Sequence, residues 1–352
     1  MHFPNLEHVG WNDDVARSYE DHLAAGIEPG RVGVQHRGAW GVATESGERT
    51  TGITGRLRHD APDGDLPVVG DWVGLRDGLI DLVLPRTSKF SRKTPWTAVA
   101  EQVLVANVDV AFLVMGLDER DFNVRRLERY LTTAWEGGSV PVIVLNKLDL
   151  ASDLDAQIAA TETVAFGVPI HAVSAQSGEG VDDLRRHLAG GRTVVLLGSS
   201  GVGKSSIINR LLGEEHFRIG DVRSDGRGRH TTSHRELVPV PTGGVIIDTP
   251  GLRELQLWDA DEGLEKAFAD IAELITQCRF SDCAHETEPG CAVKEALADG
   301  SLSQDRWESY LKLQRELAHL ERKLDPRLRS EERKRWATLS KSYRKRNKIV
   351  GR

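Results

Sequence analysis

The feature that most constrains the fold of this chain is the stretch Gly198–Ser205, with the sequence GSSGVGKS. It has the spacing of a phosphate-binding loop, G-x-x-x-x-G-K-S/T, and lies between a run typical of a strand (TVVLL) and one typical of a helix (SSIINRLL). Glycines there let backbone N–H groups turn inward around phosphate oxygens. We expect the Lys204 amine to contact the β and γ phosphates as a catalytic group, and the Ser205 hydroxyl to bind Mg²⁺. The residues predicted to surround the phosphates are Gly198, Ser199, Ser200, Gly201, Val202, Gly203, Lys204, Ser205 and Ser206.

Short apolar runs before and after this loop predict the rest of an α/β domain. They are VDVAFLVM, PVIVLN, PIHAVSA, RTVVLLG and GVIIDTP, and helical patterns separate the first four. One such pattern places Val124, Leu127 and Leu131 at helical spacing, with Asn123 as its N-cap. Strands that alternate with helices indicate a parallel sheet covered on both faces.

The segment Asp248-Thr249-Pro250-Gly251 follows the last of these strands. An acidic residue at a strand end, about 45 residues after the loop lysine, fits a water-mediated partner of Mg²⁺. The Gly251 amide would then contact the γ-phosphate. A D-x-x-G segment is common, but after a phosphate loop it is a specific signal.

Two further motifs predict that the base is guanine. The first is Asn146-Lys147-Leu148-Asp149, after the strand VPVIVL. The Asp149 carboxylate can accept hydrogen bonds from guanine N1–H and the exocyclic amine, a donor pair that adenine lacks. We expect Asn146 to buttress the loop and the stem of Lys147 to pack on the ring. The second is Ser174-Ala175, whose Ala175 amide would lie near guanine O6.

The order of these motifs is unusual, because the base-binding motifs precede the phosphate loop. The same sheet forms if its original ends are joined and the chain is opened elsewhere, which is a circular permutation. As a result, the D-T-P-G segment lies near the end of the α/β domain, directly before a helical region.

Residues 31–85 have short apolar stretches between Gly-rich turns and predict about five strands of a small barrel. An oligonucleotide-binding (OB) barrel is one candidate and an SH3-like barrel is the alternative. Trp40 and Trp72 fit either core packing or stacking on bases. Residues 86–107 are expected to be a basic connector.

Three cysteines and one histidine lie within fourteen residues near the C-terminus, in the order Cys278-x4-Cys283-x-His285-x5-Cys291. Three thiolates and one imidazole make a full tetrahedral set for Zn²⁺, and a closed set is typical of a structural site. The alternative is three buried free cysteines. An odd number of cysteines argues against a disulfide framework.

The net charge of −7 is unevenly distributed. Residues 327–352 carry eleven basic and two acidic side chains, a net +9, which leaves −16 for the rest. Such a tail suggests a polyanionic partner, although a solvated helical face is the alternative. No apolar run approaches the ~18 residues that a membrane span needs. With no secretory signal and no dimerising heptad seam, we expect a cytoplasmic protein that is a monomer.

Taken in order, the motifs N-K-L-D, S-A, G-S-S-G-V-G-K-S, G-R-G-R-H-T-T, D-T-P-G and C-x4-C-x-H-x5-C resemble the RsgA (YjeQ) family of GTPases over residues 31–325. The resemblance implies an N-terminal OB-fold barrel, a circularly permuted GTPase domain and a helical zinc-binding domain. It also implies a late-acting assembly factor for the small ribosomal subunit. GTP hydrolysis would be stimulated by the subunit and would accompany release. The expected domain limits are 1–30 (extension), 31–100, 101–258, 259–326 and 327–352 (basic tail).

The group that orients the attacking water must come from outside the D-x-x-G motif and the residue that follows it. Leu252 follows D-x-x-G where many GTPases have glutamine, and it cannot polarise water. His230 is the candidate replacement, although a loop histidine is ordinarily a surface residue. Thr232 is the expected switch threonine over Mg²⁺ and the γ-phosphate, with Thr231 as its alternative.

Two other functions fit parts of the sequence. One is an RNA-binding assembly module whose guanine nucleotide site is a binding switch with little hydrolysis. The other is an ATP-using phosphotransferase, which the N-K-L-D motif disfavours. In the GTPase interpretation, the barrel, the basic connector and the tail would contact ribosomal RNA.

Overall fold

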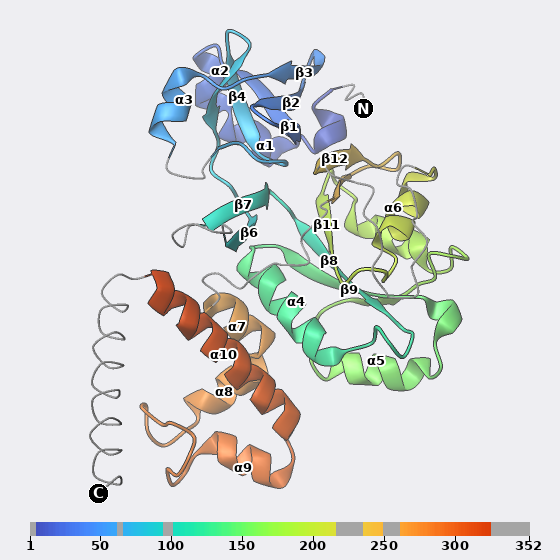
Figure 1. Cartoon of the computed structure of the whole chain (residues 1–352), viewed down its shortest axis with the longest axis vertical. Helices are drawn as coiled ribbons and strands as arrows, with labels where there is room; N and C mark the ends of the chain where they lie inside the picture. The colour runs from blue at the N-terminus through green and yellow to red at the C-terminus, as the bar shows by residue number, and fades with distance from the viewer. Residues whose placement is uncertain (1–4, 62–65, 94–100, 216–234, 249–260, 325–352) are drawn as a thin grey trace, which may run out of the picture.

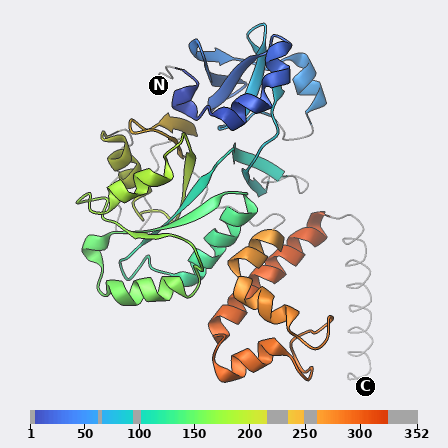
Figure 2. The ribbon, with the colours of Figure 1, turned by 180° about the vertical axis from the view of Figure 1, so that it is seen from behind.

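The computed structural model describes residues 5–61, 66–93, 101–215, 235–248 and 261–324. The chain forms a barrel, an α/β unit and a helical unit (Figure 1). The α/β unit lies between the other two, and the view from behind shows the same arrangement (Figure 2). Among the described residues, no helix combines the length and apolar character that a bilayer span requires.

The barrel is built from five strands: β1 (Glu28–His36), β2 (Ala39–Thr44), β3 (Gly47–Thr51), β4 (Trp72–Arg76) and β5 (Leu79–Val83). Antiparallel pairs run in the order β3-β2-β1-β4-β5, and a parallel bridge from Ile53 to Ile80 closes the ring. Helix α3 (Gly55–Asp60) lies between the third and fourth strands. This order, with its helix, is that of an OB fold, so the SH3-like alternative is wrong.

Trp40 and Trp72 belong to the interior of the protein. They are only 3% and 7% exposed, and the Trp40 indole donates a hydrogen bond of 2.7 Å to the carbonyl of Pro67. The interpretation of these rings as base-stacking surfaces is therefore wrong, because a buried ring has no face to offer.

The segment before the barrel is packed against it rather than extended. It contains η1 (Glu7–Val9), α1 (Asp13–Ser18) and α2 (Glu20–Ala24). Tyr19 is fully buried, and its hydroxyl donates to the carbonyl of Val73 at 2.8 Å. This hydrogen bond fastens the segment to a barrel strand.

The expected basic connector contains a short two-stranded sheet. Strands β6 (Lys89–Lys93) and β7 (Glu101–Ala106) pair antiparallel, with Phe90 opposite Val105. The sequence did not predict these strands, because β6 has a single apolar residue, Phe90, and shows no alternating pattern of its own.

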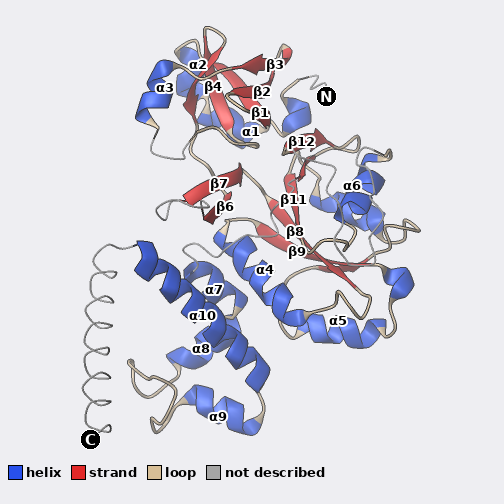
Figure 3. Cartoon of the chain, viewed as in Figure 1, coloured by secondary structure: helices blue, strands red, loops and turns tan. Residues whose placement is uncertain are grey.

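The α/β unit has the predicted parallel sheet, and its strand order is β10-β9-β8-β11-β13. Its strands are β8 (Val110–Gly116), β9 (Val140–Asn146), β10 (Ile170–Ala172), β11 (Thr193–Leu197) and β13 (Val245–Asp248). Strand β12 (Glu236–Pro239) pairs antiparallel with β13 and also meets β1 of the barrel, where Val34 lies opposite Glu236. The barrel and this sheet are thus continuous (Figure 3).

Both faces of the parallel sheet are covered, which confirms the sequence prediction. Successive residues of a strand point to opposite faces. Ile143 shares a buried cluster with Leu127 of α4 (Val124–Glu136), and Val142 shares another with Ile207 of α6 (Lys204–Leu212). The Asn123 side chain caps α4, as predicted, by accepting from the Arg126 amide at 3.0 Å. Further covering elements are η2 (Leu148–Leu150), α5 (Leu154–Glu162) and η3 (Val181–His187).

The helical unit consists of α7 (Asp261–Ala267), α8 (Ala269–Thr276), α9 (Ala292–Asp299) and α10 (Gln304–Leu324). Figures 1 and 2 both show α7 and α10 beside α4 of the α/β unit. The buried Arg306 guanidinium of α10 contacts the Glu128 carboxylate of α4 at 2.8 Å. The helical unit is therefore docked on the helix that covers the sheet.

Candidate functional site

The phosphate loop follows β11 and ends at the first turn of α6, as its motif predicts. Two of its glycines are required by close contacts. A Cβ at Gly203 would lie 2.2 Å from the Asn146 side-chain nitrogen, and Gly203 also has a φ of +94°. A Cβ at Gly198 would lie 2.5 Å from the carbonyl oxygen of Val114. Any side chain at either position would push the loop away from its neighbouring strands.

The charged groups of the predicted phosphate site meet at the carboxyl edge of the sheet. The Lys204 amine donates to the carbonyls of Gly198 (2.8 Å) and Ser199 (2.7 Å), so it lies over the loop. Ser205 and Ser206 occupy the first turn of α6 and are half-buried. Asp248 ends β13, the parallel neighbour of β11. The predicted Mg²⁺ partners Ser205 and Asp248 therefore come from adjacent elements.

Asn146 joins the base-binding motifs to the phosphate loop. Its amide nitrogen donates to the carbonyl of Val202 at 2.8 Å, and its oxygen accepts from the Ala175 amide at 2.9 Å. The side chain is 2% exposed. One buried amide thus holds three separate loops in register, and a buried group with both partners satisfied is costly to replace.

The side chain of Asp149 is placed by Ser174. The Ser174 hydroxyl donates to an Asp149 carboxylate oxygen at 2.5 Å, and the Ser177 amide donates to the same hydroxyl at 3.1 Å. Ser174 is buried, whereas Asp149 is exposed. The Asp149 carboxylate therefore lies at the surface, and the buried Ser174 hydroxyl fixes its orientation.

Lys147 has partners that the sequence did not predict. It has a φ of +68°, and its amine contacts the carboxylates of Asp118 (2.5 Å) and Asp121 (2.8 Å), in the loop after β8. Burial alone would lower the pKa of Lys147, but the two carboxylates outweigh it and the pKa lies above its usual value. The D-x-x-D spacing in a loop beside the N-K-x-D strand is the signal that could have identified them.

Several predicted site residues lie outside the described part of the chain. They are His230, Thr231, Thr232, Thr249, Pro250, Gly251 and Leu252, together with the basic tail 327–352. The roles of His230 and Thr232 therefore stay predictions.

The structure brings the four predicted metal ligands together in the helical unit. Cys278 lies just after α8, and Cys291 precedes the first residue of α9. The ligand atoms of Cys278, Cys283, His285 and Cys291 all lie within 4.8 Å of one another. Ligand atoms this close together can bind one ion. Such an ion would join three segments of a loop-rich region.

Individual distances support a tetrahedral site. The Cys278 and Cys291 sulfurs are 3.9 Å apart, and His285 Nδ1 lies 3.6 and 3.4 Å from them. A tetrahedron with Zn–S of ~2.3 Å and Zn–N of ~2.05 Å has S···S and S···N edges of roughly 3.8 and 3.6 Å. Burial raises the pKa of the Cys278 thiol, but hydrogen bonds from the backbone N–H groups of Val293 and Ala292 outweigh this effect. The pKa of Cys278 therefore lies below its usual value. The donor set therefore fits Zn²⁺.

Comparisons with known proteins agree with this architecture. A profile of the RsgA GTPase family matches residues 83–258. An ABC transporter profile matches residues 181–350, a stretch that includes the phosphate loop but neither N-K-L-D nor Ser174-Ala175.

Relatives of similar length match most of the chain. "Small ribosomal subunit biogenesis GTPase RsgA 1" of Oceanobacillus iheyensis is 48% identical over 90% of this chain and 92% of its own. "Small ribosomal subunit biogenesis GTPase RsgA" of Opitutus terrae is 45% identical over 99% of both. The corresponding protein of Streptomyces coelicolor is 44% identical over 94% of this chain and 91% of its own.

Two solved structures share the fold. YjeQ from Thermotoga maritima superposes with a TM-score of 0.63 at 30% identity, over 83% of this chain and 99% of that protein. YloQ, described as a circularly permuted GTPase, gives a TM-score of 0.60 at 26% identity, over 83% of this chain and 96% of that protein. The order of base-binding and phosphate-binding strands seen here is the permuted one.

Proposed function

The chain belongs to the RsgA family, and it is a GTPase of small ribosomal subunit maturation; from this premise we propose how its own residues bind and hydrolyse GTP. The observation that carries the proposal is the Asn146 side chain, which bonds the phosphate loop at Val202 and the base loop at Ala175. Because one amide sets the distance between these loops, base and phosphates are recognised together.

Guanine is selected by Asp149. The Ser174 hydroxyl fixes the Asp149 carboxylate to accept from N1–H and the exocyclic amine. The Ala175 amide, which donates to the Asn146 side chain, would lie near O6. Asp118 and Asp121 hold the Lys147 stem along the ring. An adenine nucleotide would leave Asp149 without donors, and such an unpaired group is strongly disfavoured.

The phosphates bind to the loop amides and Lys204. Ser205 would hold Mg²⁺, with Asp248 acting through water and Thr232 closing over the γ-phosphate. When bound there, the ion would supply positive charge to the β and γ oxygens. Lys204 adds a second positive charge at the same oxygens, and its present carbonyl partners lie within the loop itself.

Hydrolysis to GDP and phosphate needs an oriented water molecule, and the Leu252 side chain has no group that could hydrogen-bond to it. We assign this task to His230, which would act when the small subunit is bound. Turnover is then slow alone and faster with the subunit, and hydrolysis accompanies release.

The rest of the chain serves binding to the subunit. Cys278, Cys283, His285 and Cys291 would hold one structural Zn²⁺, which supplies folding energy and no chemistry. Ribosomal RNA would be contacted by the barrel, the connector and the basic tail. The protein would act as a cytoplasmic monomer.

The decisive experiment is GTP turnover with and without purified small subunits, using large subunits as the control. Selective acceleration by the small subunit is the expected result. Equal turnover under all three conditions would contradict stimulation and favour a binding switch with little hydrolysis.

Two variants test the assigned residues. Asp149→Ala should weaken GTP binding by about 100-fold or more and reduce the preference for GTP over ATP, since the base loses its donor-matched partner.

His230→Ala should lower stimulated kcat by roughly 100-fold while GTP affinity stays unchanged. An unaltered stimulated kcat would overturn the role of His230.

A further inference from the structure

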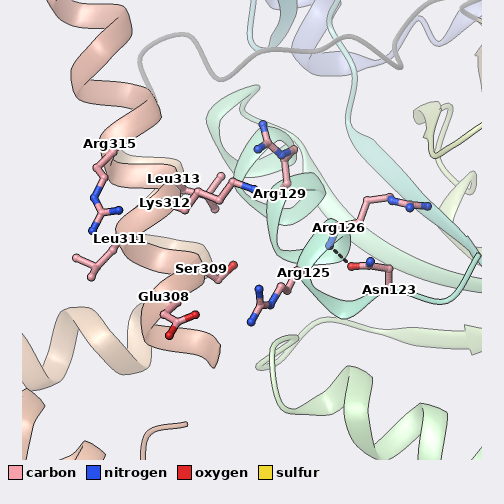
Figure 4. Close-up of a pocket in the computed structure, with 10 residues that line it drawn as sticks. All are labelled: Asn123, Arg125, Arg126, Arg129, Glu308, Ser309, Leu311, Lys312, Leu313 and Arg315. Carbon is pink, nitrogen blue, oxygen red and sulfur yellow. Dashed lines mark hydrogen bonds between the residues drawn. The ribbon is translucent and has the colours of Figure 1, made fainter. Parts of the chain in front are cut away.

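A basic cavity of about 620 Å³ lies between α4 of the α/β unit and α10 of the helical unit. Figure 4 shows Ser309 and Lys312 of α10 and Arg125 of α4 between the two helices, whereas Leu311 and Arg315 lie on the other side of α10 in this view. The cavity is lined by Asn123, Arg125, Arg126, Arg129, Glu308, Ser309, Leu311, Lys312, Leu313 and Arg315. Five of these side chains are cationic, and Glu308 is the single acidic one among the lining residues. Such an excess of positive charge between two helices needs a counter-charge.

Carboxylates of the protein offset only part of this charge. Arg125 pairs with Asp305, and Arg129 pairs with Glu316 at 2.9 Å. Within the described residues, Lys312 and Arg315 have no carboxylate partner, and both side chains are exposed. The unbalanced charge therefore faces the open side of the cavity.

The cavity also contacts the GTP site through one side chain. Arg126 donates from Nη1 to the hydroxyl of Ser199 at 2.8 Å, and the Tyr130 hydroxyl lies 3.3 Å from the same atom. Ser199 is the second residue of the phosphate loop. A ligand that draws the Arg126 guanidinium toward the cavity would change the support of that loop.

We propose that this cavity binds the phosphodiester backbone of RNA in the small subunit, and that Arg126 transmits its occupancy to the phosphate loop. The proposal rests on the function proposed above, which supplies the partner. The cationic groups extend over two facing helices, and the eight residues of α10 from Glu308 to Arg315 span ~10 Å. A single small anion would use only part of this length, whereas successive phosphates of a strand would use all of it.

Coupling of this kind works in both directions. If RNA in the cavity changes the affinity of the GTP site for GTP, then GTP must change the affinity for the subunit by the same factor. Arg126 acts here as a positioning residue, because it touches Ser199 and not the reacting phosphate.

The binding half is tested with the double variant Lys312→Ala/Arg315→Ala and purified small subunits. Each lost phosphate contact should reduce the slope of log K against log salt by about 1, so the expected reduction is about 2. The matched control Lys312→Arg/Arg315→Lys keeps both charges and should bind like the wild type. An unchanged slope in the alanine variant would overturn the proposal.

The alternative of a small anion is tested in the same series. Tripolyphosphate binding is measured by calorimetry for wild type and the alanine variant. If the variant loses tripolyphosphate but binds subunits with an unchanged slope, the cavity holds a small anion and the RNA proposal is wrong. If the wild type itself does not bind small subunits, the proposed function fails, which is a different result.

The coupling half is tested by GTP turnover at increasing subunit concentration. The Lys312→Ala/Arg315→Ala variant should need about tenfold more subunit for half-maximal stimulation, with basal turnover and maximal stimulation unchanged. Arg126→Gln should instead lower the maximal ratio of stimulated to basal turnover, even at saturating subunit. Equal maximal ratios in Arg126→Gln and the wild type would overturn the role of Arg126.

Discussion

Two buried arginines join the α/β unit to its neighbours, and they differ in the charge of their hydrogen-bond partners. On the barrel side, Arg31 is 2% exposed and donates only to neutral oxygens among its hydrogen-bond partners. These are the carbonyls of Val9, Gly70 and Asn107 and the hydroxyl of Thr193. One side chain therefore holds the N-terminal segment, the barrel and the first residue of β11 together.

On the other side, Arg306 is 7% exposed and is matched by charge. It contacts the carboxylates of Glu128 at 2.8 Å and Asp270 at 2.6 Å, and it donates to the carbonyl of Ala267 at 3.0 Å. Its guanidinium also lies 4.6 Å from the centre of the Phe268 ring. This junction is an ion-pair network rather than a set of carbonyls.

The difference predicts how each junction responds to mutation and pH. Burial lowers the pKa of Arg31 to about 10, although Asp109 and Asp71 oppose the shift. Burial raises the pKa of Glu128, although Ser309 and Arg306 oppose it. Both junctions thus carry a desolvation cost, but only at the second does the arginine contact a carboxylate directly, and that carboxylate can take up a proton when the arginine is removed.

The largest expected effect comes from a dependence that only the helical unit has. Cys283→Ser, or removal of the metal by chelation, should unfold the region of α8 and α9, since structural Zn²⁺ supplies ~10 kcal/mol or more in small domains. Hydrogen exchange should show lost protection in residues 269–299 and unchanged protection in β1–β5 of the barrel. Retained protection in α9 after chelation would contradict a structural metal.

The next largest effect is expected from Arg306→Met. It leaves the buried Glu128 carboxylate unpaired, which costs about 3–5 kcal/mol in the free energy of unfolding. Urea denaturation at pH 7.5 measures this loss. The double variant Arg306→Met/Glu128→Gln should recover a large part of it, because no buried charge remains at that position. Equal losses in the single and double variants would contradict the ion-pair interpretation.

The pH dependence of the same variant separates the two junctions. Without Arg306, the folded-state pKa of Glu128 rises further above its unfolded value, so the folded protein gains protons as the pH falls. The destabilisation by Arg306→Met should therefore be smaller at pH 5.5 than at pH 7.5. A loss that grows toward low pH would show that Glu128 is not the group left unpaired.

Arg31→Met should have a smaller effect, of about 2 kcal/mol. The variant leaves carbonyl acceptors without donors, but it also removes the cost of burying the guanidinium. Neutral acceptors do not titrate, and Asp71 keeps its contact of 2.8 Å with Arg86. The loss measured by urea should thus be nearly the same at pH 5.5 and 7.5. A strong pH dependence would mean that a carboxylate, not the carbonyls, holds this junction.

The sequence predicted the parts of the molecule that have a fixed spacing. The loop around Lys204, the base motif with Asp149 and the cluster of Cys278 to Cys291 lie where their motifs place them, because each uses local backbone geometry. The parallel sheet followed from its apolar runs for the same reason.

What the sequence did not reveal depends on contacts between distant residues. Arg31 and Arg306 are single arginines without a motif, and their partners lie up to 178 residues away. The contact of Arg126 with Ser199 also crosses 73 residues. Strand β6 was missed because pairing with β7, not its own composition, makes it a strand.

The smallest effect concerns a histidine pair at neither junction, and it sets the background for the pH comparison. His171 and His187 face each other with 2.9 Å between their Nε2 atoms. Burial lowers the pKa of both; that of His187 falls to about 4, with His171 and Arg186 adding to the shift. As the pH falls below ~6.5, these histidines therefore bind protons in the unfolded chain before they do so in the folded one. Stability from this pair is present above pH ~6.5 and is lost as the pH falls toward 4.

For these partly exposed rings, the expected loss between pH 7.5 and 5.5 is at most about 1 kcal/mol. The His187→Gln variant keeps a polar side chain that does not titrate, so its stability should fall less over the same range. Urea denaturation of this variant at both pH values measures the difference. His187→Gln can also be added to Arg306→Met and to Arg31→Met. It removes the pH dependence of stability that the histidine pair contributes to both variants, so that the remaining pH dependence belongs to the junction itself. If His187→Gln loses as much stability as the wild type, the acid sensitivity comes from other groups and the pair is not its source.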